Sequence, residues 1–151
     1  MRLGERLLWK IAAPPKLLGV KIPKLILQPL VENAIQHGIE NKRIQGTVLI
    51  KLEETAGGDS IKITVQDNGP GIDQTELHQL NEEIKKENVS SFKGIGMALT
   101  NVNKRLSLYY DAYSLGGLHL ESELGSGTKV VFEIPAGEGN KCEYKDNLNC
   151  G

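Results

Sequence analysis

The sequence predicts an α+β fold: a two-layer α/β sandwich with about three helices on one face of a mixed, mostly antiparallel sheet. Segments with the two-residue alternation of strands slightly outnumber those with the period of helices. The last two predicted strands are close neighbours along the chain and therefore form a hairpin. A single layer of helices on one face is the economical way to cover such a sheet.

The composition limits the kind of protein. The 151 residues suffice for one domain with one core, and they are 39% hydrophobic and 25% charged. A formal net charge of -1 gives no general attraction to nucleic acid or to an anionic membrane, so we expect neither as a partner. No apolar run approaches the roughly 18 residues of a membrane-spanning helix.

We expect one domain over residues 1–135 and a disordered tail over 136–151, which is rich in glycine, asparagine and charge. Cys142 and Cys150 lie in that tail without a CxxC spacing or a nearby histidine, which favours reduced cytoplasmic thiols over a metal site. The chain begins in the middle of a strand-like pattern, which suggests a piece of a longer protein.

The first half of the chain predicts a strand at 6–11, a helix at 23–37 and a pair of strands at 47–54 and 61–67. The turn-like residues 57–59 join that pair. Pro29 removes one backbone donor from the helix, which predicts a kink there or a helix start near it.

The second half begins with Asp73, which predicts a capped helix start with Glu76 three residues later. Its apolar stripe is Leu77, Leu80 and Ile84. The polar segment 85–94 suits a mobile loop. A helix over 95–110 and strands over 117–124 and 128–135 complete the domain. The helix over 95–110 is predicted to place on one face Ile95, Leu99, Val102, Leu106 and Tyr109.

Asp67 falls at the end of an alternating strand, on the same parity as Ile61, Ile63 and Val65. A buried carboxylate without partners costs several kcal/mol or is forced neutral. Two explanations stay open from the residues alone. Asp67 either bonds backbone donors in the turn "DNGPGI" or accepts a hydrogen bond from a ligand.

Thr128 is in phase with the apolar residues of the last strand, so its hydroxyl is expected to point inward, near Asp67 if their strands are neighbours. On the helix at 23–37, Asn33 and His37 lie at one margin of the apolar arc, with Glu32 and Gln36 beside them. A margin of this kind faces either a cleft or solvent.

Gly94 and Gly96 precede and open the helix over 95–110. Glycine lets the backbone approach a ligand, and the free N–H groups of a helix start favour an anion. The pattern lacks the third glycine of a dinucleotide fingerprint and the GK[ST] of a Walker A loop. The dipole at a helix end is worth only about 0.3–1 kcal/mol, so a polyphosphate would need a divalent cation as well.

Taken in order, "ENAIQHG", "DNGPGI", "GIGMALTNVNKRL" and "GSGTKVVFEIP" resemble the N, G1 and G2 boxes and the final Gly-Thr of the GHKL ATP-binding superfamily. That superfamily includes gyrase, Hsp90, MutL and the sensor histidine kinases. The stretch "IPKLILQPLVENAIQHGI" is most similar to the LytS/YesM-like branch of those kinases. The resemblance covers roughly residues 5–135 and implies a Bergerat-type sandwich and an ATP-binding catalytic domain.

The resemblance implies roles for individual residues. Asn33 matches the asparagine that ligates the Mg²⁺ bridging the phosphates, which makes it both the metal ligand and the predicted catalytic residue. Asp67 matches the aspartate that accepts a hydrogen bond from the adenine amino group, and Thr128 matches the threonine that helps to hold adenine. Gly69 and Gly71 would let the base approach the backbone.

The same boxes imply further cofactor contacts. His37 and Ile72 lie in the first two boxes, and Gly94 and Gly96 match the loop beneath the phosphates. The segment from about residue 82 to Lys93 would form a lid over ATP.

The sequence departs from the family at two positions. Pro29 stands where gyrase, Hsp90 and MutL carry the glutamate that activates water, which disfavours efficient ATP hydrolysis. Gln36 stands where many histidine kinases carry a phosphate-binding lysine; Lys93 or Arg105 is the candidate to supply that charge.

The resemblance implies a sensor histidine kinase domain that uses ATP and Mg²⁺ and passes the γ-phosphate to a histidine on a separate upstream domain. Its partners would be that phosphoacceptor and dimerisation domain and, indirectly, a response regulator. We expect a cytoplasmic domain of a membrane-anchored sensor. The alternative is a nucleotide-binding regulatory module without kinase turnover, and a hydrolysing or serine-phosphorylating relative ranks third.

Overall fold

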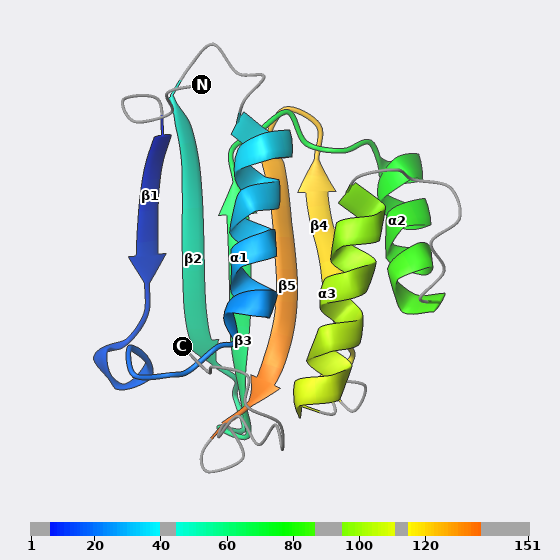
Figure 1. Ribbon diagram of the computed structural model, residues 1–151. Helices are drawn as coiled ribbons and strands as arrows, with labels where there is room; N and C mark the ends of the chain where they lie inside the picture. Colours follow the sequence, from blue (N-terminus) through cyan, green and yellow to red (C-terminus); the bar gives the residue numbers. More distant parts are fainter. Residues whose placement is uncertain (1–6, 40–44, 87–94, 111–114, 137–151) are drawn as a thin grey trace.

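The structure is a computed structural model, and it describes residues 7–39, 45–86, 95–110 and 115–136. Five strands form one sheet in the order β1-β2-β3-β5-β4 (Figure 1). They span Leu7–Ala12 (β1), Gly46–Glu54 (β2), Ser60–Asp67 (β3), His119–Glu123 (β4) and Gly127–Pro135 (β5). β1 runs parallel to β2, and the other neighbouring pairs are antiparallel. The prediction of a mixed, mostly antiparallel sheet is confirmed.

Three helices, α1 (Lys24–Asn33), α2 (Gln74–Lys86) and α3 (Ile95–Tyr110), cover one face of the sheet (Figure 1). A short 3-10 turn at Pro15–Leu17 precedes α1, and the chain continues after α1 as a π-helical segment, Ala34–Ile39. The two-layer α/β sandwich predicted from the sequence is therefore confirmed. The predicted tail lies outside the described residues apart from Ala136.

The core lies between these helices and the covered face of the sheet. Residues of alternating parity on β3 and β5 face the helices, as the period of a strand requires. The side chains that are least exposed come from all three helices and from the central strands: Ile26, Leu30, Ile63, Val65, Leu80, Ile84, Leu99, Val102, Leu106, Phe132 and Ile134. The predicted apolar stripe of α2 is confirmed, because Leu77, Leu80 and Ile84 are all buried.

Asp73 caps α2 as the sequence predicts. Its Oδ1 accepts hydrogen bonds from the backbone N–H groups of Thr75 (2.9 Å) and Glu76 (3.2 Å). These amides belong to the first turn of the helix, where no carbonyl is available to them. The helix therefore begins where the capping residue satisfies its free donors.

Two predictions need correction. The helix α1 begins at Lys24 and continues through Pro29, so the predicted start near Pro29 is wrong. Residues 85 and 86 belong to α2 rather than to a loop, because Leu80 and Ile84 keep the last turns packed on the core. At the end of α3, the predicted face is confirmed, since Tyr109 is partly buried and packs against the core, and the next residue, Tyr110, is buried as well.

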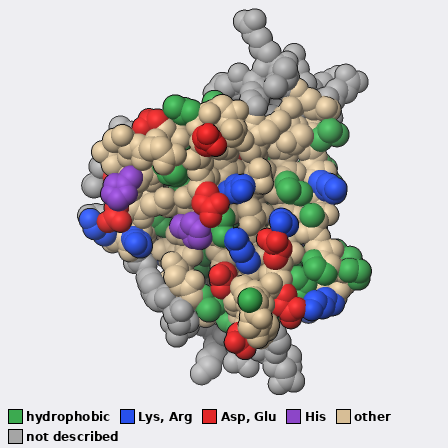
Figure 2. Space-filling model, turned by 180° about the vertical axis from the view of Figure 1, so that it is seen from behind, with side chains coloured by type: hydrophobic (Ala, Val, Ile, Leu, Met, Phe, Trp, Pro, Cys, Tyr) green, Lys and Arg blue, Asp and Glu red, His purple; other side chains and the backbone are tan. Residues whose placement is uncertain are grey.

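The uncovered face of the sheet carries acidic, basic and histidine side chains interspersed with one another (Figure 2). His119, predicted to point outward, is exposed there and lies 3.4 Å from Glu121. At one edge, β1 exposes Leu8, Trp9 and Ile11.

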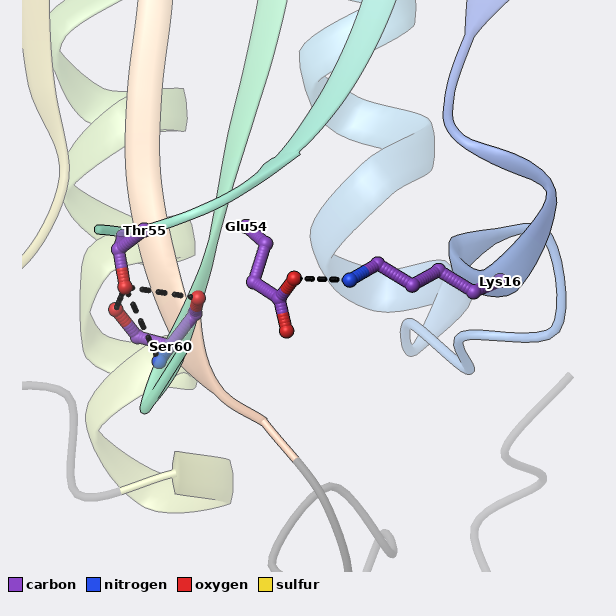
Figure 3. Close-up of polar contacts among 4 residues, drawn as sticks. All are labelled: Lys16, Glu54, Thr55 and Ser60. Carbon is purple, nitrogen blue, oxygen red and sulfur yellow. Dashed lines mark hydrogen bonds and ion pairs between the residues drawn. The ribbon is translucent and has the colours of Figure 1, made fainter. Parts of the chain in front are cut away.

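The β2–β3 hairpin is held together at its turn (Figure 3). The Thr55 hydroxyl lies 3.0 Å from both the carbonyl oxygen and the hydroxyl of Ser60, and Lys16 forms an ion pair with Glu54. Ser60 in turn donates a 2.6 Å hydrogen bond to Glu133 of β5. These contacts fix the end of β3 opposite to Asp67.

Candidate functional site

A cavity of about 150 Å³ lies where β3 ends, between the last residues of α1 and the first residue of α3. Its walls combine apolar side chains of the core with a few polar groups. The lining residues are Leu30, Asn33, Ala34, Val65, Asp67, Pro70, Gly71, Ile72, Glu76, Ile95, Leu120, Thr128 and Val130. A concave site with apolar walls and few polar groups is the usual form of a small-molecule site.

Asp67 lies in the wall of this cavity and is 7% exposed. Its Oδ1 accepts a 2.7 Å hydrogen bond from the backbone N–H of Gly69. The first explanation that the sequence left open is confirmed, because the carboxylate accepts from a backbone donor of its own turn. The second, acceptance from a ligand, stays a prediction for a carboxylate that lines the cavity. A carboxylate oriented by a backbone N–H is a positioned acceptor.

Thr128 also lines the cavity, and its Oγ1 lies 3.0 Å from the Oγ of Ser122 on the neighbouring strand. The register of the two antiparallel strands pairs these residues directly. Ser122 Oγ also accepts a hydrogen bond from the N–H of Ile72 (2.9 Å) and donates one to the carbonyl oxygen of Gly127 (2.7 Å). Ser122 thus joins β4, β5 and the segment after β3, which brings Asp67 and Thr128 into one wall.

Asn33 is the last residue of α1 and lines the cavity. Glu32 is exposed and accepts a hydrogen bond from the Gln28 amide (3.0 Å), on the side of the helix that does not line the cavity. Gln36 is exposed and is not among the lining residues. The side chain of His37 lies outside the described part of the structure.

The glycines near the site approach the protein's own backbone. Gly71 has φ +75°, and a Cβ there would lie 2.1 Å from the carbonyl oxygen of Glu123. Gly127 has φ +98°, and its Cβ would lie 2.1 Å from the carbonyl oxygen of Asp67. Gly71 also lines the cavity. No pattern in the sequence predicts that the β4–β5 turn packs against the end of β3 in this way. The buried Gly69 supplies the N–H that Asp67 accepts.

At the other wall, α3 begins at Ile95, which lines the cavity, and Gly96 is buried directly after it. Lys93 and Gly94 lie outside the described residues. The predicted lid overlaps the described chain only at 82–86, which is helical rather than a loop. Arg105 donates to the carbonyl oxygen of Leu25 (2.7 Å) and does not line the cavity.

Two residues at or beside the site, Ser122 and Glu76, were not predicted from the sequence. Ser122 is on the apolar parity of its strand with Leu120, so the argument used for Asp67 and Thr128 could have found it. Glu76, by contrast, reads as part of a helix cap, and only the packing of α2 beside β4 places it at the cavity.

Asn33 and Asp67 are the polar groups of the wall that could hold a nucleotide with magnesium. The described residues contain no group of three or more His, Cys, Asp or Glu side chains that could hold a metal ion. Mg²⁺ retains several waters and is commonly bound by one or two protein oxygens together with phosphate oxygens. The Asn33 amide oxygen suits that role, and the buried Asp67 carboxylate suits a base amino group.

The fold and the site thus define a two-layer sandwich domain with an apolar cavity that carries an asparagine, an aspartate and a threonine. The family described as Histidine kinase-, DNA gyrase B-, and HSP90-like ATPase matches residues 20–138. The chain belongs to this family. Within it, the chain falls in the LytS/YesM-like branch of the sensor kinases, as its relatives indicate.

The chain is 40% identical over 114 residues to Sensor protein LytS of Bacillus cereus, an alignment that covers 76% of this chain and 18% of the relative. It is 36% identical over 135 residues to Sensor histidine kinase YesM of Bacillus subtilis, which covers 89% of this chain and 20% of the relative. The chain therefore spans about a fifth of the length of these relatives.

Among solved structures, the catalytic domain of histidine kinase ThkA superposes with a TM-score of 0.61 at 25% identity. The superposition covers 86% of this chain and 80% of that domain. The likeness confirms the sandwich fold. Within the described residues, no helix has the length and apolar character that crossing a bilayer requires.

Proposed function

We propose that this domain binds Mg²⁺-ATP in the cavity beside Asp67 and serves as the catalytic domain of a sensor histidine kinase. The observation that carries the proposal is the pairing of a buried carboxylate and a threonine hydroxyl in one wall of a cavity whose other lining residues are mostly apolar. A purine needs apolar walls for its faces and a few fixed polar groups for its edge. Asp67 and Thr128 would supply those groups, beside the backbone at Gly69, Gly71 and Ile72.

The phosphates would extend from the base toward the start of α3. Asn33 would ligate Mg²⁺, and His37, Lys93, Gly94 and Gly96 are proposed to line the phosphate path. The start of α3 beside the cavity supports this direction, because a helix start attracts anions. ATP supplies the γ-phosphoryl group, and the role of the domain is positioning and charge neutralisation, as in phosphoryl transfer generally.

The names of the relatives support a sensor histidine kinase. Of the histidines with described side chains, His78 and His119 are both exposed and neither lines the cavity. We propose that the phosphoacceptor histidine lies on a separate dimerisation domain upstream, and that a response regulator receives the phosphate from it. We place the domain in the cytoplasm, as part of a membrane-anchored sensor.

A second candidate is a nucleotide-binding regulatory module without kinase turnover. The observation that favours it is Gln36, which stands where many kinases carry a phosphate-binding lysine and is exposed outside the cavity. Labelled ATP given to the complete protein decides between the two candidates. Acid-labile phosphate on histidine supports the kinase, and nucleotide binding without such phosphate supports the module.

The binding step is tested by calorimetric titration of the chain with Mg²⁺-ATP and by the shift of its melting temperature. A ligand that binds only the folded state stabilises it by about 2.7 kcal/mol at 100 times its Kd. We expect saturable binding and a clear rise in melting temperature. The absence of both at millimolar nucleotide refutes the proposal.

Steady release of phosphate tests whether the isolated domain hydrolyses ATP. Pro29 stands at the position where the ATP-hydrolysing relatives carry their catalytic glutamate, and the exposed Glu32 bonds Gln28 away from the cavity. We therefore expect no efficient hydrolysis by the isolated domain. Steady phosphate release would instead favour a hydrolysing relative.

A further inference from the structure

The hydroxyl of Ser122 has three polar neighbours, and two of them determine whether the third donates or accepts a hydrogen bond. A serine hydroxyl has one hydrogen to donate and two lone pairs that accept. The carbonyl oxygen of Gly127, 2.7 Å away, can only accept, so it takes the single hydrogen of Ser122. The backbone N–H of Ile72, 2.9 Å away, can only donate, so it occupies one lone pair of Ser122.

This leaves one lone pair on Ser122 for the third neighbour, the hydroxyl of Thr128 at 3.0 Å. Since Ser122 has no hydrogen left, Thr128 is the donor of that bond. Its only hydrogen is then used inside the protein, and its oxygen retains only the capacity to accept. Thr128 lines the cavity, so the cavity wall presents an acceptor at this point.

From this proton count we infer that Ser122 is a specificity-determining residue: it holds Thr128 as a hydrogen-bond acceptor and thereby makes the site select purines with a 6-amino group over 6-keto purines. The inference rests on the proposed function, which places a purine in the cavity. Ser122 does not line the cavity itself and acts through Thr128, so it is a positioning residue.

The chemistry of the ligand edge follows from the acceptors of the wall. The Asp67 carboxylate and the Thr128 oxygen both accept, and both line the cavity. A 6-amino group offers two hydrogens, directly or through a water. A 6-keto oxygen is itself an acceptor, so it could form no hydrogen bond with these two acceptors. A ligand that leaves the polar groups of a site without hydrogen bonds binds more weakly.

The two explanations of Ser122, specificity and simple support of the fold, differ in a measurable way. If Ser122 acts through the Thr128 hydroxyl, its removal frees that hydroxyl to rotate and donate to a keto oxygen. The preference for ATP over inosine triphosphate, which carries the 6-keto group, then falls. If Ser122 only supports the fold, both nucleotides lose affinity together.

The experiment measures the Kd of Mg²⁺-ATP and of Mg²⁺-inosine triphosphate by calorimetry, for the wild-type chain, Ser122→Ala, Thr128→Val and the double variant. We expect Ser122→Ala to lower the preference for ATP by about tenfold, the worth of one net hydrogen bond. In the Thr128→Val background, Ser122→Ala should leave the preference unchanged, because no hydroxyl remains to be oriented.

The control is Ser107→Ala, since Ser107 is a partly buried serine of α3 that donates to the Asn103 carbonyl oxygen (3.1 Å), with neither residue lining the cavity. It should keep the wild-type preference. An unchanged preference in Ser122→Ala overturns the inference. The inference is also overturned if Ser122→Ala lowers the preference for ATP equally in the wild-type and in the Thr128→Val background.

Should Ser122→Ala fail to fold, Thr128→Ser and Thr128→Val decide the matter in its place. Retention of the preference by Thr128→Ser and its loss in Thr128→Val support the inference, whereas an unchanged preference in Thr128→Val overturns it. Failure of the proposed function looks different, because the wild-type chain would then bind neither nucleotide.

Discussion

The Nη1 of Arg105 donates a 2.7 Å hydrogen bond to the carbonyl oxygen of Leu25. This carbonyl is the one that Pro29, four residues later, leaves without a helical donor, because proline has no N–H. The guanidinium on α3 therefore replaces the missing bond of α1. This contact explains how α1 continues through Pro29 to Asn33 and the cavity.

The contact predicts a coupling between Arg105 and Pro29. Arg105→Ala should destabilise the fold by about 1 kcal/mol, since it leaves the carbonyl to water. In a Pro29→Ala background the residue at 29 has its own N–H, so the same change should cost less. Urea unfolding of the wild type, both single variants and the double variant measures the coupling free energy. If the losses of unfolding free energy in the two single variants add up to the loss in the double variant, this explanation is ruled out.

Gly127 and Gly125 form a matched pair for a test of backbone packing. Both have positive φ, but an added Cβ meets nothing within 4 Å at Gly125 and lies 2.1 Å from the Asp67 carbonyl oxygen at Gly127. Gly125→Ala should cost about 1–2 kcal/mol from its backbone conformation alone. Gly127→Ala should cost clearly more and should weaken ATP binding. Equal losses in urea unfolding would show that the close approach does not constrain Gly127.

Asp67→Asn tests the acceptor of the base. The variant keeps an oxygen for the Gly69 N–H but replaces a charged acceptor by an amide that also donates. We expect ATP affinity to fall about tenfold or more, with little change in unfolding free energy. Calorimetric titration checks the affinity. Retained affinity would mean that the base binds elsewhere.

Asn33→Ala tests the magnesium site separately from the base. If Asn33 ligates Mg²⁺, the variant should lose mainly the part of ATP affinity that depends on Mg²⁺. The measurement compares ATP binding with Mg²⁺ and with a chelator in both proteins. Asn101→Ala, at an exposed position of α3, is the control. If Mg²⁺ raises the ATP affinity of the wild type and of Asn33→Ala by the same factor, Asn33 is not a Mg²⁺ ligand.

Tyr110 predicts a pH dependence of stability. Burial, with a smaller contribution from Tyr109, raises the pKa of Tyr110 to about 12 from its model-peptide value of 10.0. The folded state therefore favours the neutral phenol, and this stabilisation is complete below pH 10 and is lost as the pH rises toward 12. Tyr110→Phe cannot ionise, so its unfolding free energy should fall less than that of the wild type over this range. Parallel curves for the two proteins would contradict the assignment.

Much of the fold could be predicted because it depends on short-range patterns. The period of α3 gives its bounds, 95–110, and the side chain of Asp73 caps α2 within three residues of itself. The prediction also places Tyr109 on the apolar face of α3, where it packs against the core, although the next residue, Tyr110, is more deeply buried. It failed at 85–86 because a polar segment remains helical when preceding turns are packed.

Local patterns in the sequence encode the strands, the helices and the inward parity of Asp67 and Thr128, because a strand alternates its side chains whatever its neighbours are. The tertiary structure decided which groups those side chains meet. Ile72 bonds Ser122 across 50 positions of the chain, and Arg105 reaches Leu25 across 80. No local pattern encodes such pairs, since they depend on the order of the strands and on which helices pack together.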